Sequence, residues 1–165
     1  MKIAITGHSA GIGQELARIY QAQGHEIIGL SRRNGYNIRS LPKVAGMVEP
    51  CDVFINNAQV GFAQTELMWE VWTRWVSQEK YIINISTQMT EQEVAPTLDL
   101  DQYLIQKKAL ELAHAQCCLR SKWPQMVLIR PGMIATQPGW EPPEYQDVGQ
   151  WAQQIVDSLK DKIHG

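Results

Sequence analysis

The sequence predicts an α/β protein in which one doubly wound parallel sheet carries helices on both faces. Short apolar runs of strand length alternate with amphipathic segments of helix length along almost the whole chain, and this alternation is typical of parallel sheets joined by helical crossovers. Right-handed crossovers place helices on both faces of such a sheet. A glycine-rich turn, Gly7 to Gly13, also separates the first apolar run from the first amphipathic segment, as in sheets that bind a ligand at their strand ends.

About six strands are expected, from short runs of β-branched and aliphatic residues that stop at a glycine, a proline or a polar residue. The first run stops at Gly7, and the last stops before Pro131. In chain order, the strands are expected at Lys2–Thr6, Glu26–Ser31, Tyr36–Ile38, Val53–Asn56, Tyr81–Ser86 and Met126–Ile129.

Helices are expected between and after these strands. In the first, Ile12, Leu16 and Ile19 recur at helical spacing, and Gly24 follows as a C-cap. Pro50 follows the second helix and prevents its continuation. In chain order, the helices are expected at Ile12–Gln23, Leu41–Val48, Glu66–Gln78, Asp101–Arg120 and Asp147–Lys160.

The composition is that of one ordinary globular domain. The chain has 165 residues, of which 44% are hydrophobic and 19% are charged, and its formal net charge is −2. A single domain over residues 1–165 is therefore expected. The charge gives no basic footprint for nucleic acid, and no apolar stretch approaches the ~20 residues of a membrane span. Three cysteines without a CxxC pair predict reduced thiols in a cytoplasmic protein, and no His or Cys spacing indicates a metal site.

The glycine-rich turn predicts a binding site for a dinucleotide. Gly7 permits a tight turn off the strand, Gly11 lets the backbone approach a pyrophosphate, and Gly13 lets the helix pack against the strand. The N–H groups at the start of the helix then face the phosphates. An ordinary strand-to-helix turn is the alternative interpretation. The expected cofactor contacts in this turn are Gly7, Ser9, Ala10, Gly11, Ile12 and Gly13.

The end of the second strand favours NADP(H) over NAD(H) as the cofactor. Ser31 stands where an NAD site expects an acidic residue against the ribose hydroxyls, and Arg32 and Arg33 follow it. A guanidinium group suits a 2′-phosphate because it donates two parallel hydrogen bonds. The alternative is a pair of solvated surface arginines.

Tyr103 and Lys107 form a candidate acid/base pair in the longest expected helix. Residues four positions apart share one face of a helix. A lysine ammonium beside a phenol lowers the pKa of the phenol, so that the tyrosine can exchange a proton near neutral pH. This spacing also occurs by chance in many proteins, so the pair by itself does not establish an active site.

Five motifs follow one another along the chain, each at an expected strand end or helix face. They are Thr6-Gly7 with Gly11-Ile12-Gly13, then Asn56-Asn57-Ala58, then Asn84-Ile85-Ser86-Thr87, then Tyr103 with Lys107, and then Arg130-Pro131-Gly132-Met133-Ile134-Ala135-Thr136. The ordered set resembles the short-chain dehydrogenase/reductase superfamily across nearly the whole chain. The resemblance implies a Rossmann fold and a nicotinamide-dependent oxidoreductase that acts on a small carbonyl or alcohol substrate.

The resemblance also implies residue roles. Tyr103 would be the general acid or base, and Lys107 would bind the nicotinamide ribose and lower the pKa of the tyrosine. Thr87 aligns best with the family's catalytic serine, and Ser86 is the other candidate. The implied contacts with the cofactor are Asn37 and Ile38 at the adenine, Asn57 and Ala58 at the adenosine ribose, Ile134 and Thr136 at the carboxamide, and also Ile85, Pro131 and Gly132.

Several positions depart from the family pattern. Gln59 replaces a glycine of the family, and no asparagine lies between Asn57 and Asn84, where the family carries an extra active-site asparagine. Thr87 precedes Tyr103 by 16 residues, which is longer than usual. The chain is shorter than a typical member. The segment after position 136 is reduced to a proline-rich stretch with Pro138, Pro142 and Pro143.

These departures leave two main functions open, beside a third interpretation as a degenerate structural subunit that binds neither cofactor. The first is an NADP(H)-dependent reductase or alcohol dehydrogenase. The second is a redox sensor or regulatory module that binds NADP(H) with little or no turnover. The resemblance further implies a homodimer or homotetramer. Trp69, Trp72 and Trp75 recur every three residues in one helix, and both a subunit interface and core packing remain open for them.

Overall fold

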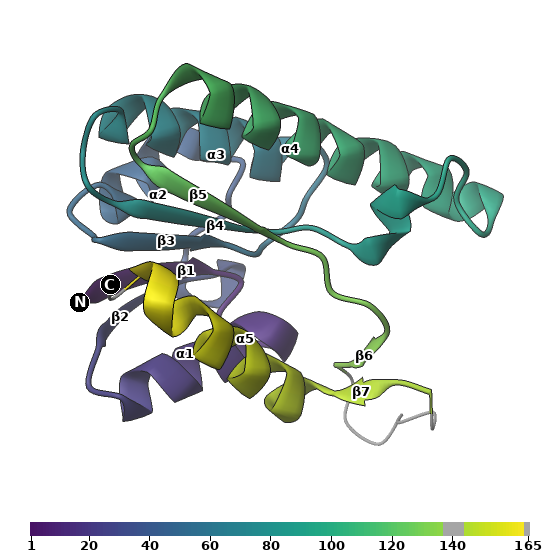
Figure 1. The fold of residues 1–165 in the computed structure, drawn as a ribbon, viewed down its shortest axis with the longest axis horizontal. Helices are drawn as coiled ribbons and strands as arrows, with labels where there is room; N and C mark the ends of the chain where they lie inside the picture. Colours follow the sequence, from purple (N-terminus) through teal and green to yellow (C-terminus); the bar gives the residue numbers. More distant parts are fainter. Residues whose placement is uncertain (137–143, 164–165) are drawn as a thin grey trace.

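Five parallel strands form the sheet in the computed structural model, which describes residues 1–136 and 144–163 (Figure 1). The strand order is β2-β1-β3-β4-β5, and all neighbouring strands are parallel. The prolines at 138, 142 and 143 lie outside the described residues. The strands are β1 (Lys2–Thr6), β2 (Glu26–Leu30), β3 (Val53–Asn56), β4 (Tyr81–Ile85) and β5 (Gln125–Ile129).

Helices cover both faces of the sheet, so the expected doubly wound α/β fold is confirmed. On one face lie α1 (Gly11–Ala22) and α5 (Val148–Ile163), below the sheet in Figure 1. On the other face lie α2 (Leu41–Val48), α3 (Ala63–Trp75) and α4 (Asp101–Arg120).

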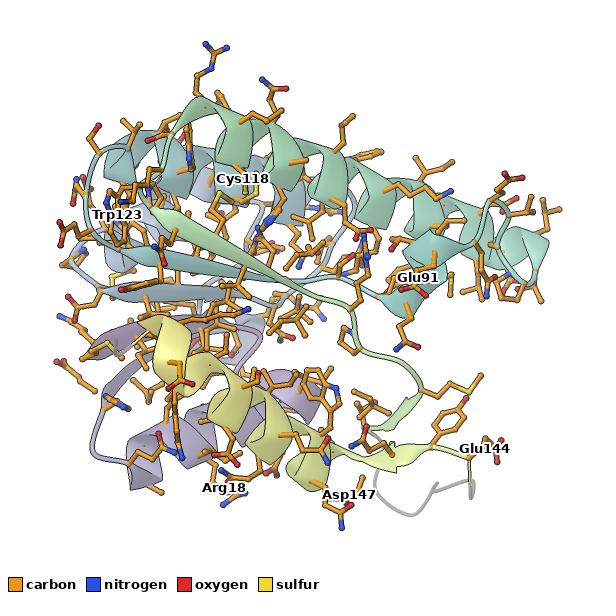
Figure 2. All side chains as sticks on the ribbon, in the orientation of Figure 1. Arg18, Glu91, Cys118, Trp123, Glu144 and Asp147 are labelled. Atoms are coloured by element: carbon orange, nitrogen blue, oxygen red, sulfur yellow. The ribbon has the colours of Figure 1, made fainter. Side chains whose placement is uncertain are left out.

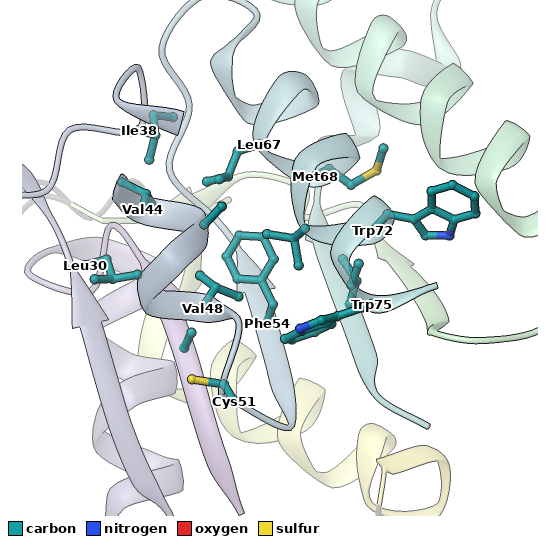
Figure 3. Close-up of a cluster of buried hydrophobic side chains, with 14 of the residues drawn as sticks. Leu30, Ile38, Val44, Val48, Cys51, Phe54, Leu67, Met68, Trp72 and Trp75 are labelled. Carbon is teal, nitrogen blue, oxygen red and sulfur yellow. The ribbon is translucent and has the colours of Figure 1, made fainter. Parts of the chain in front are cut away.

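Alternating side chains of the strands fill the two cores. Ile3 and Ile5 pack under α1 and α5, whereas Ala4 between them faces α2 and α3, because successive side chains of a strand point to opposite faces. Figure 3 shows Phe54 of β3 and Trp75 of α3 within the second core. All four residues of β3 are buried, as expected for a central strand with helices on both sides.

The expected strand at Tyr36–Ile38 is wrong, and the sheet has five strands where about six were expected. After β2 the chain forms a short 3₁₀ helix, Arg32–Asn34, and Gly35 adopts a left-handed φ of 91°. The N–H of Tyr36 then donates to the carbonyl oxygen of Ser31 at 2.8 Å. This turn reverses the chain before a strand can extend beside β2, and the side chain of Ile38 enters the core beneath α2.

The other element boundaries agree with the sequence to within a few residues. The largest difference is α3, which begins at Ala63 and ends at Trp75, three residues earlier than expected at each end. Val76 leaves the helical region with a ψ of 132°, and Ser77 has a left-handed φ of 69°, so the helix cannot continue. Two further strands of two residues each, β6 (Ile134–Ala135) and β7 (Gln146–Asp147), pair in parallel outside the main sheet.

The three tryptophans of α3 divide between core and surface. Trp75 is fully buried and Trp72 is nearly so, which supports the core interpretation for both. Trp69 is 49% exposed and stacks on Trp72 with ring centroids 5.1 Å apart. The interpretation as part of a subunit interface therefore stays open for Trp69. No helix in the described part of the chain is long and apolar enough to cross a membrane.

Candidate cofactor and active site

The topology creates a crevice at the carboxyl ends of β1 and β3. The chain leaves β1 for β2 on one side and later returns to β3 on the other, so the connections that leave these two neighbouring strands diverge, and ligands of doubly wound sheets bind at this point. Glu91 follows β4 and Trp123 precedes β5, and they mark opposite ends of the sheet in Figure 2. The motif residues lie at the end marked by Glu91.

The glycine turn has the geometry that a phosphate cradle requires. Gly7 and Gly11 adopt left-handed φ angles of 69° and 54°, which side chains disfavour. A Cβ on Gly13 would lie 2.2 Å from the carbonyl oxygen of Gly7, so α1 packs against the turn only because Gly13 lacks a side chain. The amino end of α1 therefore meets the carboxyl end of β1, where its free N–H groups suit an anion.

Thr6 and Asn57 hold the turn from behind. The Thr6 hydroxyl accepts hydrogen bonds from the backbone N–H groups of Asn57 at 3.0 Å and Ala58 at 3.1 Å. The side-chain amide of Asn57 donates to the carbonyl oxygen of Thr6 at 3.1 Å. Asn57, expected at the adenosine ribose, thus braces the turn and does not line the cavity beside it, whereas Ala58 does.

A cavity of about 290 Å³ lies where the loops after β1, β2 and β3 meet. It brings together most of the contacts expected around the adenosine half of a dinucleotide. Gln59, which replaces a glycine of the family pattern, lines it as well. Leu30, Tyr36 and Val60 also line it, although the sequence reasoning did not single them out; their places beside the expected contacts are the signal that could have found them. The expected residues in its lining are Gly7, Ser9, Ala10, Ser31, Arg32, Arg33, Asn37, Ile38 and Ala58.

The rim of this cavity is positively charged. Arg32 and Arg33 are exposed, and the Arg33 guanidinium donates to the carbonyl oxygen of Ser9 in a long contact of 3.5 Å. The amine of Lys43 lies 5.0 Å from the ring centroid of Tyr36. Among the residues that the structure describes, no acidic side chain lines the cavity, so the rim suits a phosphate better than the hydroxyls of an unmodified ribose.

Thr87 and Tyr103 meet at the end of β4. Burial raises the pKa of Tyr103 above its usual range, contrary to the lowering expected from Lys107, and the nearby Thr87 hydroxyl acts in the opposite direction. Thr87 also accepts a hydrogen bond from the N–H of Met89 at 3.2 Å, which orients its side chain. The Ser86 hydroxyl is buried and has no hydrogen-bond partner among the described residues. Of the two candidate hydroxyls, Thr87 is the one that contacts Tyr103.

Lys107 lies on the same face of α4 as Tyr103. Its amine is 5.7 Å from the centroid of the Tyr103 ring, and its side chain is buried. The amine donates to the side-chain oxygen of Gln64 at 2.9 Å and to the carbonyl oxygen of Ile85 at 3.0 Å. Burial lowers the pKa of Lys107 to about 8, and the carboxylate of Glu111 acts in the opposite direction.

Gln64 was missed by the sequence reasoning, which looked for an asparagine before the fifth expected strand. Its place at the beginning of α3, soon after the Asn56-Asn57-Ala58 motif, is the only sequence signal that points to it. Gln59 bridges the same region. Its amide donates to the carbonyl oxygen of Gly61 at 3.1 Å and to the side chain of Gln106, and so ties the cavity wall to the helix that carries Tyr103.

The segment after β5 runs from the turn after β4 back to the glycine turn. The N–H of Gln88, next to Thr87, donates to the carbonyl oxygen of Pro131 at 2.9 Å. A Cβ on Gly132 would lie 2.8 Å from the side-chain oxygen of Gln88, so these two loops touch. Thr136 packs against Gly11. Ile12 and Ile134, two other expected contacts, pack against the core beneath α1 and α5.

Metal chemistry has no evident site in the described part of the chain. Residues 1–136 and 144–163 contain no group of three or more His, Cys, Asp or Glu side chains that could hold an ion. All of the three cysteines are free, and Cys118 alone among them is exposed.

Comparison with known proteins gives the fold. No protein-family profile and no curated protein matches the sequence. A short-chain dehydrogenase from Burkholderia cenocepacia in complex with NADP matches with a TM-score of 0.75 and 16% identity, over 96% of this chain and 84% of that one. An alcohol dehydrogenase from Thermococcus sibiricus complexed with 5-hydroxy-NADP matches with a TM-score of 0.75 and 17% identity, over 97% and 91%. A bulky-bulky ketone specific alcohol dehydrogenase from Comamonas testosteroni matches with a TM-score of 0.74 and 20% identity, over 98% and 83%. The chain therefore has the fold of the short-chain dehydrogenases and reductases.

Proposed function

We propose that the protein is an NADP(H)-dependent oxidoreductase of the short-chain dehydrogenase/reductase type, which interconverts a small carbonyl compound and its alcohol. The observation that carries this proposal is the position of the Lys107 amine at the end of β4, 5.7 Å from the Tyr103 ring centroid and 3.0 Å from the Ile85 carbonyl oxygen, two residues before Thr87. Two segments of the chain, the turn after β4 and helix α4, supply the groups that proton transfer at a carbonyl oxygen requires.

The bound cofactor would supply or accept the hydride. Tyr103 gives its proton to the substrate oxygen during reduction, and the Thr87 hydroxyl binds the same oxygen. The raised pKa of Tyr103 keeps the phenol protonated at neutral pH, which suits the direction of carbonyl reduction. The positive charge of Lys107 favours the phenolate left after the transfer.

NADP(H) is the proposed cofactor because of the charge around the cavity. Arg32 and Arg33 would bind the 2′-phosphate, and Ser31 beside them would complete the pocket. The glycine turn and the amino end of α1 would bind the pyrophosphate.

The test is the oxidation of NADPH with a panel of small ketones and aldehydes. Tyr103→Phe should lower kcat on the order of 10² to 10⁴-fold, with NADPH affinity within about twofold of wild type. Thr87→Val removes the second hydroxyl and should lower kcat with the same panel. Equal rates for wild type and Tyr103→Phe would refute the mechanism.

An NADP(H)-binding sensor or regulatory module is the second candidate. It is favoured by the reach of the cavity, whose lining includes neither Thr87 nor Tyr103, so the described residues enclose the adenosine half of a cofactor and leave the reacting end open. An open site excludes water poorly and weakens electrostatic catalysis. NADPH binding without turnover of any compound in the panel would favour this function.

A homodimer built on α3 and α4 is also proposed. Ile105, Leu112 and Leu119 recur at seven-residue intervals along α4, and Leu112 and Leu119 are 74% and 84% exposed. Trp69 adds an exposed aromatic ring from α3. Apolar side chains gathered along a helix pair in this way are typical of subunit interfaces.

A further inference from the structure

Gln64 has a side-chain amide whose orientation is set by the backbone. The side chain is buried, with 2% of its surface exposed. Its nitrogen donates to the carbonyl oxygen of Asn56 at 2.8 Å and to the carbonyl oxygen of Ile85 at 2.9 Å. The reverse orientation would set the amide oxygen against two carbonyl oxygens, which have no hydrogen to donate. The amide oxygen can therefore face only the remaining direction, where Lys107 lies.

The backbone of Gln64 is held as firmly as its side chain. The side-chain nitrogen of Asn56 donates to the backbone carbonyl oxygen of Gln64 at 3.0 Å and to the side-chain oxygen of Asn84 at 2.9 Å. Asn84 in turn hydrogen-bonds the His114 ring at 3.0 Å. Asn56 and Asn84 are fully buried. This network ties the beginning of α3 to β3, β4 and α4, although the side-chain oxygen of Asn56 has no hydrogen-bond partner among the described residues.

In this arrangement the Lys107 amine donates hydrogen bonds to two acceptors. One is the Gln64 side-chain oxygen and the other is the Ile85 carbonyl oxygen, which also accepts from Gln64. An ammonium group has three N–H bonds, and no third acceptor for it is found among the described residues. One N–H is thus left for a ligand, and its direction follows from the two that are held.

Gln64 also bears on the charge of the amine. The groups that face the amine from α3 and β4 are the neutral Gln64 amide and the Ile85 carbonyl, while Tyr103 and Glu111 face it from α4 itself. Burial lowers the pKa of Lys107, so the charged form needs good acceptors to persist. An amide oxygen held in place accepts from the ammonium without adding a negative charge near Tyr103.

We propose that Gln64 is a positioning residue that holds the Lys107 amine in place as an ammonium, with one N–H left for a ribose hydroxyl of the nicotinamide cofactor. The identity of the ligand rests on the proposed function, whereas the link between Gln64 and Lys107 does not. Gln64 touches neither substrate nor reacting atoms in this proposal and acts through Lys107.

The test measures the titration of Lys107 directly, by the NMR shift of its Cε carbon, assigned by the loss of that signal in Lys107→Arg. Gln64→Met keeps the length of the side chain and removes the acceptor. It should lower the pKa of Lys107 by about one unit, a tenfold change in its acid dissociation constant. Gln106→Met is the matched control, because Gln106 neighbours Lys107 on α4 and its amide bonds to Gln59 instead. The control should leave the titration of Lys107 unchanged.

Gln64→Asn covers the case in which Gln64→Met fails to fold. It keeps the amide but withdraws it by one methylene, so it should also lower the pKa of Lys107. If neither variant folds, slow solvent exchange of the Lys107 ammonium protons in the wild-type protein would support the link, and fast exchange would refute it. A Lys107 titration that is the same in wild type and in either folded Gln64 variant would overturn the proposal.

Cofactor binding separates this inference from the proposed function. The affinity for NADPH should fall in Gln64→Met as the pH rises through the lowered pKa of Lys107, while wild type retains its affinity to higher pH. The kcat at saturating cofactor should change less than the KM for NADPH. A shifted Lys107 titration in a protein that neither binds nor oxidises NADPH would uphold the role of Gln64 and refute the reductase.

Discussion

The two ends of the crevice, which we propose as a cofactor end and a catalytic end, are built in different ways. At the cofactor end, short contiguous motifs at the ends of β1, β2 and β3 form a cavity in which backbone geometry dominates, as the left-handed φ of Gly7 and Gly11 illustrates. At the catalytic end, single side chains from three segments converge. Lys107 there depends on Gln64, which lies 43 residues earlier in the chain.

The difference bears on how each end responds to substitution. A site made by the backbone tolerates no added side-chain atoms where two backbone segments lie in close contact. The exposed charged residues at its rim can be substituted without loss of the fold. A site made by buried side chains depends on their hydrogen bonds, because a buried polar group that loses its partner costs about 1–3 kcal/mol. The two ends should therefore differ in which substitutions unfold the protein and which change only its binding or its pH dependence.

Gly13→Ala should have the largest effect, because the new Cβ would lie 2.2 Å from the carbonyl oxygen of Gly7. We expect a loss of about 3 kcal/mol or more in the free energy of unfolding, measured by urea denaturation, together with loss of NADPH binding. Gly46→Ala in α2 is the matched control. Nothing lies within 4 Å of its Cβ position. The free energy of unfolding of this variant should equal that of wild type or exceed it by up to about 1 kcal/mol. Equal stability of the two variants would contradict the close approach.

Arg32→Ala and Arg33→Ala should test the charged rim without harm to the fold. Each should weaken NADPH binding by about tenfold to a hundredfold, since a hydrogen bond to a charged group is worth about 1.5–3 kcal/mol, and leave NADH binding almost unchanged. Titration of cofactor fluorescence measures both. Arg18→Ala removes an arginine that pairs with Glu15 on α1 and serves as the control. If NADH binds more tightly than NADPH to the wild-type protein, Arg32 and Arg33 do not bind a 2′-phosphate.

The buried amine of Lys107 should make stability depend on pH. Its pKa is lowered to about 8 in the folded protein from 10.5, so the unfolded chain binds more protons between these values. The contribution of Lys107, taken as the free energy of unfolding of wild type minus that of Lys107→Met, should therefore rise from pH 8 to pH 9.5 by on the order of 1–2 kcal/mol. Below pH 8 this difference should be flat. The buried thiols of Cys51 and Cys117, whose pKa values are raised to about 11, act in the opposite direction in both proteins and cancel in the difference. Lys108→Met is the control and should keep the pH dependence of wild type; a difference between wild type and Lys107→Met that does not change with pH would refute the assignment.

Leu112→Glu should have the smallest effect on the crevice. It places a charge in the exposed apolar stripe of α4, and sedimentation should show a shift from dimer to monomer. NADPH affinity should change by less than about threefold, because Leu112 is exposed on α4 and does not line the cavity. A wild-type protein that sediments as a monomer at micromolar concentration would refute the dimer.

Much of the fold and of the cofactor end could be predicted from local sequence patterns. The alternation of Ile3, Ala4 and Ile5 between two cores follows from the period of a strand. The close approach at Gly13 and the turns at Gly7 and Gly11 follow from the lack of a side chain. The shared face of Tyr103 and Lys107 follows from the pitch of a helix. Each of these patterns spans a few residues and needs no knowledge of distant segments.

Other features were decided by the tertiary structure. Tyr36–Ile38 has the residues of a strand, but the turn at Gly35 directs Ile38 into the core beneath α2. Gln64 contacts Lys107 only because α3 and α4 pack side by side at the end of β4. Trp69 is exposed and Trp75 is buried because only part of α3 packs against the sheet. Sequence spacing determines which side chains share a strand or helix face, whereas contacts between distant segments depend on packing, in which each side chain must find partners for its apolar surface and its polar atoms.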